Sequence, residues 1–270
     1  MKRTITGMDA YSKMLSTPLP AKTATYTPIS HSSVIHRMRT EITKAGFIIS
    51  NENYRCTNDG QVAVGSLTLN YKSDPDIVLA ANFTNSYNKQ LAFRFGLGGI
   101  VKVCSNGMVI TNDKFGRYKK IHKGEADILA EGKISEFISD ADSYWETLIE
   151  HKEIMKDVIL SKAAAYDLIG QLFFDEKVLN TMQLNIIKNE IEKPSFSYGA
   201  VDSQSAWVLY NHITHALKEC HPSEWMESQA TVHSLFDAEL KLSPIPVLVE
   251  SEPVVSESDT SELDISEVNE

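Results

Sequence analysis

The fold is decided by residues 47–71, FIISNENYRCTNDGQVAVGSLTLNY. Residues 47–57 have the composition of a β-strand, and Asn58-Asp59-Gly60 is a turn sequence because Asp-Gly tolerates the positive φ angles of a type I′ turn. Residues 62–71 return as a second strand, in which we expect a β-bulge at Gly65-Ser66, where the apolar alternation shifts. The stretch therefore predicts an antiparallel hairpin.

The alternation continues beyond this hairpin and predicts a meander. Residues 77–83 and 91–95 are further strand candidates, because apolar side chains recur at every second position of the latter. Gly96-Leu-Gly-Gly99 interrupts the pattern before another candidate at residues 100–104. No Lys-Ser/Thr follows these glycines and they open no helix, so we interpret them as a flexible connector rather than a phosphate-binding loop.

Helical spacing of apolar residues appears on both sides of the meander. A helix is predicted at about 33–45, and from about residue 126 onward we expect helices over the ranges 128–162, 163–173, 176–192, 205–220 and 223–240. Residues 1–30 contain Pro18, Pro20 and Pro28, which exclude a continuous helix and favour an irregular N-terminal arm.

These patterns together predict an α+β fold with an antiparallel sheet (meander) in the first half packed with a helical second half. The predicted single domain covers residues 31–242, sheet-rich over 47–124 and helical over 125–242. Residues 243–270 are rich in Pro, Ser and Glu, which predicts a disordered acidic tail.

The charge is distributed unevenly along the chain. The formal net charge of −10 argues at first against a nucleic-acid partner. Residues 1–124, however, hold 17 basic residues against 7 acidic ones, a net charge of +10. Residues 125–242 hold 9 against 21, and residues 243–270 hold none against 8. Such asymmetry indicates an anionic partner for the first half, or else attraction between the halves or to a partner subunit.

Composition excludes several classes of protein. The longest apolar run, residues 77–81, is too short to span a bilayer, so we expect no membrane association through a transmembrane helix. A secretory signal is not predicted, because polar residues interrupt the start of the chain. Three widely spaced cysteines form no disulfide framework and favour a reducing compartment, so we expect a cytoplasmic protein.

No catalytic motif is evident, and we predict a protein that is not an enzyme and needs no cofactor. We find no nucleophile elbow or triad setting, and Asp74 and Asp76 flank a proline in a predicted turn. His212 and His215 share a helix face that a metal could bridge, but their setting lacks the paired spacing of structural zinc sites. We therefore favour surface or core histidines there, with metal binding as the alternative.

The clearest chemical signal is the basic segment 114–123, KFGRYKKIHK. It places five cations among Phe115 and Tyr118, and single strands are bound in this way, with cations along the phosphates and aromatic rings against the bases. The alternative is a solvated surface loop. Other basic residues in the same half of the chain, including Arg94 and Lys102, favour binding.

The acidic tail permits two interpretations. It can serve solubility alone, which is the commoner role of acidic chain ends. It can also be an interaction peptide or an electrostatic mimic that competes with nucleic acid for the basic half. Leu263, Ile265 and Val268 alternate with acidic residues near the end of the chain and support the second interpretation.

Three segments of the sheet region resemble a known family. They are Asn82-Phe-Thr-Asn-Ser86, Phe93-Arg-Phe95 and Val101-Lys-Val-Cys-Ser-Asn-Gly-Met108, with His122 following. They are similar to the core of the phage/plasmid-like protein family known as domain of unknown function 932, over about residues 25–240. Lys102 stands where Arg is common in that family, and Gly107-Met108 replaces the frequent Thr-Leu.

The resemblance implies a bacteriophage, prophage or plasmid source but provides no catalytic residues. A helix with a curved meander backed by helices is also similar to the single-strand annealing recombinases of phages, which is an analogy of fold alone. Cys104 and Asn106 of the third segment are interpreted as a packing residue and a turn residue.

Two functional hypotheses follow. The first is a non-enzymatic bacteriophage or mobile-element protein that binds single-stranded nucleic acid, as an annealing or recombination accessory and in a ring or other homo-oligomer. Its predicted contacts are Arg94, Lys102, Phe115, Arg117, Tyr118, Lys119, Lys120 and Lys123. The alternative is a phage-encoded interaction protein that inhibits a host defence or nuclease through its acidic surface, with a host protein as the partner of the tail.

Overall fold

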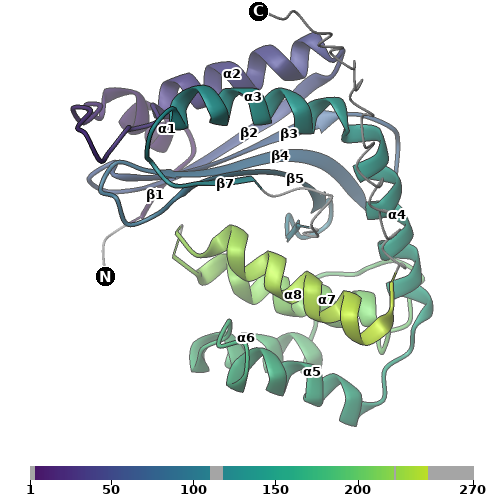
Figure 1. The fold of residues 1–270 in the computed structure, drawn as a ribbon. Coiled ribbons are helices and arrows are strands. Elements are labelled where there is room, and N and C mark those ends of the chain that lie inside the picture. The colour runs from purple at the N-terminus through teal and green to yellow at the C-terminus, as the bar shows by residue number, and fades with distance from the viewer. Residues whose placement is uncertain (1–3, 110–117, 222, 243–270) are drawn as a thin grey trace, which may run out of the picture.

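The computed structural model describes residues 4–109, 118–221 and 223–242, and contains one antiparallel sheet flanked by helices (Figure 1). The strand order is β1-β2-β3-β4-β5-β6, and β7 also pairs with β5. The strands are β1 (Thr4–Thr6), β2 (Ile48–Thr57), β3 (Val62–Asn70), β4 (Ile77–Ser86), β5 (Phe93–Val101), β6 (Gly107–Met108) and β7 (Tyr118–Lys120). The predicted meander in the first half is confirmed.

The hairpin of β2 and β3 forms at the predicted turn. Thr57 donates a 2.6 Å hydrogen bond from Oγ1 to Asp59 Oδ1, and Gly60 has a φ of +71°. The predicted bulge at Gly65-Ser66 is wrong, because both residues pair regularly with β2 and the register shifts instead between Ile49 and Asn51. Gly65 interrupts the apolar pattern for a packing reason: a Cβ there would lie 2.2 Å from the ring of Phe83.

The glycine-rich segment 96–99 lies inside β5 and is not a connector, so that prediction is also wrong. Gly98 pairs with Ala80 and Gly99 with Leu79 in an unbroken ladder to β4. A Cβ on Gly99 would lie 2.9 Å from Leu148 Cδ2. These glycines therefore allow other elements to approach the strand closely.

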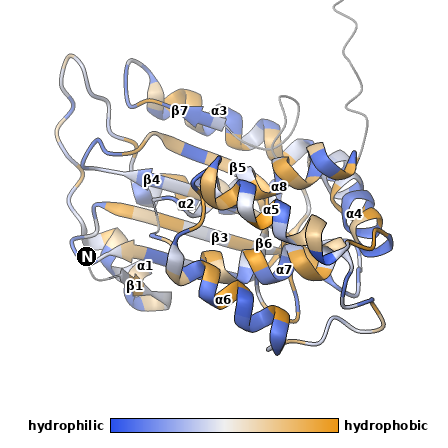
Figure 2. Cartoon of the chain, turned by 90° about the horizontal axis from the view of Figure 1, so that it is seen from below, coloured by the Kyte–Doolittle hydropathy of each residue, from blue (hydrophilic) through white to orange (hydrophobic). Residues whose placement is uncertain are grey.

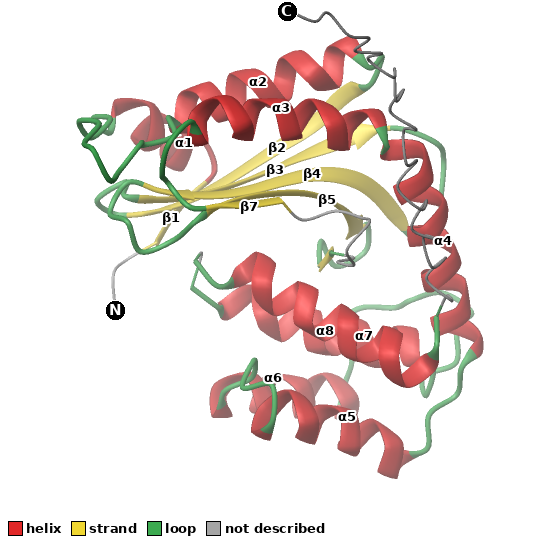
Figure 3. Ribbon diagram, viewed as in Figure 1, coloured by secondary structure: helices red, strands yellow, loops and turns green. Residues whose placement is uncertain are grey.

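Helices lie on both sides of the sheet (Figure 3). On one face are α1 (Gly7–Ser16), α2 (His31–Lys44) and α3 (Ala126–Ser139), and α4 (Ala141–Asp157) descends beside the sheet. Beneath the other face lie α5 (Lys162–Phe174), α6 (Thr181–Glu192), α7 (Ala206–Ala216), the 3₁₀ turn η1 (Leu217–Glu219) and α8 (Trp225–Leu240). The predicted helical second half is confirmed.

Two helix predictions need correction. The lead-in predicted to be irregular contains β1 and α1, whose Ala10 and Met14 are buried in the core; α1 ends at Ser16, before the first proline of the sequence. The helix predicted over 128–162 is two helices that meet at Asp140, with the second ending at Asp157. The acidic tail, 243–270, lies outside the described residues.

Strand alternation gives the sheet two chemically different faces. Leu67, Leu79, Phe83 and Phe95 are buried in the core on one face of the sheet, where Phe95 stacks on Phe137 of α3. Within each of these strands, the residues at the alternate positions face the opposite side, because successive side chains in a strand alternate. Figure 2 views this second side from below, with α7 and α8 in front of the sheet. Among the described residues, no helix has the length and apolar character needed to cross a membrane.

Candidate nucleic-acid interface

The lower face of the sheet carries a polar row that crosses six strands. Cross-strand partners lie side by side on the same face of a sheet. The row consists of Thr6, Arg55, Val64, Thr84, Arg94 and Lys119, each paired with the next. Val64 is the apolar member of the row, and the other five residues place cations and hydroxyl groups on this face, where the upper face contains the core.

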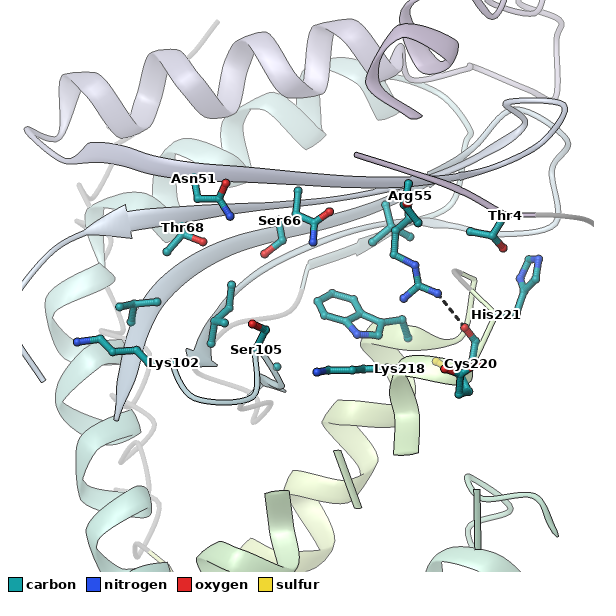
Figure 4. A pocket seen from close by; sticks show the side chains of 18 residues that line it. Thr4, Asn51, Arg55, Ser66, Thr68, Lys102, Ser105, Lys218, Cys220 and His221 are labelled. Atoms are coloured by element: carbon teal, nitrogen blue, oxygen red, sulfur yellow. Dashed lines mark hydrogen bonds between the residues drawn. The ribbon is translucent and has the colours of Figure 1, made fainter. Parts of the chain in front are cut away.

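A groove of about 880 Å³ lies between this polar face and the connection from α7 to α8 (Figure 4). The sheet contributes polar side chains to it, among them Asn51, Asn53, Arg55, Ser66 and Thr68. The loop after β5 adds Lys102 and Ser105, and the helical layer adds Lys218, Glu219, Cys220, His221 and Trp225. Val64, Val78 and Ile100 also line the groove, so its lining combines three cations and one carboxylate, Glu219, with apolar side chains and Trp225.

Three cations of the groove are held by backbone carbonyl groups. Arg55 Nη2 donates a hydrogen bond to the Cys220 oxygen at 3.1 Å, as Figure 4 shows. Lys218 Nζ donates to the carbonyl of Cys104, and Lys102 Nζ donates to that of Asp74. A carbonyl accepts the hydrogen bond without cancelling the charge, so three cations face the one carboxylate of the lining, Glu219. Burial lowers the pKa of Lys218 from its ordinary value.

The segment 101–108 holds the helical layer beneath the sheet. Asn106 Nδ2 donates to the Asn211 carbonyl at 2.8 Å, and the Cys104 thiol donates to Asn211 Oδ1 at 3.5 Å. A Cβ on Gly107 would lie 2.3 Å from Gln229 Oε1, so α8 packs directly on this backbone. The segment thereby positions the α7–α8 side of the groove.

A second cavity, of about 410 Å³, lies where β7 meets β5, and we call it the β7 cavity. Four cations line it: Lys89, Arg94, Lys119 and Lys123. Tyr26 and His122 also line it, with ring centroids 5.6 Å apart. Burial lowers the pKa of His122, so its ring is neutral near pH 7 and the lysines and arginine provide the charge.

The residues predicted to contact nucleic acid fall into four groups. Arg94, Lys119 and Lys123 come together in the β7 cavity, and Lys102 lines the groove. Tyr118 pairs with Phe95 and Lys120 with Phe93, so both lie on the face of the sheet opposite to Arg94 and Lys119. Phe115 and Arg117 lie outside the described residues.

Two of these residues have structural partners. The half-buried Tyr118 ring packs edge-on against Phe93, with centroids 6.3 Å apart. Arg94 is only 7% exposed, and its Nη2 is ion-paired with Glu227 of α8. Arg94 is therefore almost completely buried in the wall of the cavity, whereas Lys119 and Lys123 are exposed.

Sequence reasoning missed much of the groove. Lys218 and Trp225 belong to the acidic half of the chain, so counting charge by segment hides them. Arg55 was recognisable from alternation, since Asn51, Asn53 and Arg55 occupy the polar positions of a strand whose Tyr54 and Cys56 are buried.

His212 and His215 both face the carboxylate of Glu190. The distances are 3.8 Å from His212 Nδ1 and 4.0 Å from His215 Nε2. Burial lowers the pKa of both imidazoles, and Ser195 Oγ donates to the same carboxylate at 2.5 Å. This cluster lies between α6 and α7, apart from the groove.

Three acidic residues, Asp74, Asp76 and Glu153, form a separate cluster, and their carboxylates lie close enough together to share one cation. The Lys152 ammonium, which is fully buried, lies 2.6 Å from Asp74 Oδ2 and 2.6 Å from Glu153 Oε1. The arrangement is an ion-pair network that ties α4 to the turn before β4.

A model of the family described as a domain of unknown function (DUF932) matches residues 18–235. The chain belongs to this family. The match to DUF932 starts after α1 and ends within α8, so it includes both sides of the groove and the connecting segment 101–108. No curated protein and no solved structure matches the chain.

Proposed function

We propose that this DUF932 protein binds single-stranded nucleic acid in the groove beneath the sheet. The observation that carries the proposal is the polar sheet face, which together with α7–α8 encloses three cations and Trp225 in one groove. Cations that follow phosphates beside an aromatic ring that stacks a base are the usual elements of single-strand binding. Annealing or recombination would be processes that such binding serves.

The two-sided groove favours an unpaired strand over a duplex. Its walls are the sheet on one side and the α7–α8 connection on the other, so a bound strand is contacted from both sides. A base can stack on Trp225 only if it is unpaired and free of its own stack. Duplex DNA keeps the faces of its bases buried and offers edges in its grooves instead.

The sheet side of the groove can hydrogen-bond bases or sugars. Asn51 and Asn53 are exposed in it, and each amide offers both donors and acceptors. Ser66 Oγ is buried without a hydrogen-bond partner in the described residues. These groups add contacts that do not depend on charge.

Fluorescence anisotropy of a labelled single-stranded oligonucleotide at rising salt concentration tests the proposal. Binding should weaken with a log–log slope of about −0.7 for each phosphate neutralised. Lys102→Gln should weaken binding and reduce the slope by about 0.7. Lys188→Gln is the matched control, because it removes the same charge from an exposed position on α6.

The absence of binding at low salt in both the full chain and a chain ending at Leu242 would contradict the proposal. Equal effects of Lys102→Gln and Lys188→Gln would show that binding does not use the groove. A host protein that remains bound after nuclease treatment, without any oligonucleotide binding, would instead support an interaction protein with an acidic surface.

A further inference from the structure

We infer that the β7 cavity is a site for a phosphate monoester and, resting here on the proposed function, that it holds the phosphorylated end of a bound strand. The cavity is separate in its lining from the groove, with which it shares no residue. The chemistry shared by a strand end and a free phosphorylated molecule is a terminal phosphate group.

The first observation concerns the burial and the hydrogen bonding of Arg94. Its side chain is 7% exposed, and Glu227 occupies Nη2 from the α8 side. The Nε and Nη1 donors are buried and have no hydrogen-bond partner in the described part of the chain. Buried donors of a charged group without an acceptor are costly. Both atoms have almost no exposed surface, so an anion in the cavity would bond to them once the guanidinium turns toward it.

The second observation is the charge of the lining. Lys89, Lys119 and Lys123 surround the same cavity as Arg94, and none of the described lining residues is acidic. Lys89 Nζ lies over the Tyr26 ring, 4.7 Å from its centroid, which orients the ammonium group at the cavity wall. Glu227 is a carboxylate in contact with Arg94, and within the described residues Lys89, Lys119 and Lys123 form no ion pair.

This excess of cations favours a monoester over an internal phosphodiester. A phosphate monoester carries a charge of about −1.5 to −2 at pH 7 and has three acceptor oxygens. A phosphodiester carries a single negative charge and has two free oxygens. Three lysines and the ion-paired Arg94 around one small cavity therefore favour an end phosphate over the phosphates within a strand.

The position of the cavity agrees with this assignment. Arg94 and Arg55 stand in the same polar row, separated by the strands β3 and β4. Three inter-strand spacings correspond to about 14 Å. A strand lying in the groove can thus reach the β7 cavity along one face of the sheet.

The experiment compares oligonucleotides of one sequence that carry a 5′-phosphate, a 3′-phosphate or hydroxyl groups at both ends. We expect one phosphorylated form to bind about tenfold more tightly than the hydroxyl form, because of the added charge-assisted hydrogen bonds. Lys119→Gln with Lys123→Gln should abolish this preference. Lys188→Gln with Lys193→Gln is the matched control at exposed positions. Arg94→Lys keeps the charge but removes the guanidinium donors, and should also reduce the preference.

A calorimetric titration with inorganic pyrophosphate provides the second arm. Oligonucleotide binding with no preference for a phosphorylated end would overturn the inference and leave the proposed function intact. Pyrophosphate binding that depends on Lys119 and Lys123, without oligonucleotide binding, would support a phosphate site for a small molecule and contradict the proposed function. If neither the oligonucleotides nor pyrophosphate bind, the inference is overturned.

Discussion

Arg55 of β2 donates a hydrogen bond to the backbone carbonyl of Cys220, which lies 165 residues later in the chain. The bond spans the groove and joins the basic first half to the helical second half. Arg55 thus combines two roles, because its charge faces the groove while its Nη2 helps to fix the opposite wall.

Replacement of Arg55 should weaken both roles. Arg55→Met should reduce oligonucleotide affinity about tenfold, and it should lower the free energy of unfolding by about 1 kcal/mol through the lost hydrogen bond. Anisotropy and urea unfolding measure these effects. Arg55→Lys keeps the charge and should retain most of the affinity; equal affinity of Arg55→Met and the unchanged chain would exclude Arg55 from binding.

Asn106 should matter for stability. Asn106→Ala removes the bond to the Asn211 carbonyl and leaves that buried oxygen without this donor. We expect a loss of about 1–3 kcal/mol in the free energy of unfolding, measured in urea. Asn70→Ala, at an exposed strand end, is the control and should change it by less than about 0.5 kcal/mol. A similar effect of both variants would contradict the role of Asn106 in holding the helical layer.

Glycine in β5 should be required for packing. Gly99→Ala places a methyl group 2.9 Å from Leu148 Cδ2 and should destabilise the fold by about 1–3 kcal/mol. Gly132→Ala in α3 meets no atom within 4 Å and should instead stabilise the helix by about 0.4–1 kcal/mol. Thermal unfolding compares them; a tolerated Gly99→Ala would show that α4 does not pack closely on the strand.

Acid should destabilise the fold through buried histidines. Burial lowers the pKa of His233 to about 3, and its Nε2 lies 2.9 Å from His151 Nδ1. The unfolded chain therefore binds a proton below about pH 6.5 that the folded chain does not bind until about pH 3. The free energy of unfolding should fall with decreasing pH across this window, by up to about 1.4 kcal/mol per pH unit for one histidine.

His233→Gln should reduce the steepness of this pH dependence by about one proton. Urea unfolding at pH 7, 6 and 5 measures it, with His36→Gln on the exposed side of α2 as the control. An unchanged slope in His233→Gln would contradict a buried neutral imidazole.

Local patterns predicted the hairpin of β2 and β3 and the strand β4, but not β1, β6 or β7. The Asn58-Asp59-Gly60 turn and the alternation of β2 and β3 are determined by residues adjacent in the sequence, so both can be recognised without the structure. The glycines of β5 were misinterpreted because the cause lies elsewhere in the chain: Leu148 packs against Gly99, and Met108 and Asn82 lie against Gly98. The helix α1 was missed because prolines beyond its end dominated the interpretation of the segment.

The candidate site was predicted only in part, for a related reason. Lys119 and Lys123 are close in sequence and fall into one cavity with Arg94. Lys218 and Trp225 face the polar sheet only because the chain returns beneath it. Charge counted along the chain could not show this pairing of distant segments.

Fluorescence of Trp225 tests the central claim most directly. Trp145 and Trp207 are 4% and 1% exposed, so among the tryptophans Trp225 is the one that lines the groove. We predict that a single-stranded oligonucleotide at low salt quenches the emission, and that Trp225→Phe removes the quenching while Trp145 and Trp207 still emit. Quenching that persists in Trp225→Phe, or none in the unchanged chain, would contradict a strand bound in this groove.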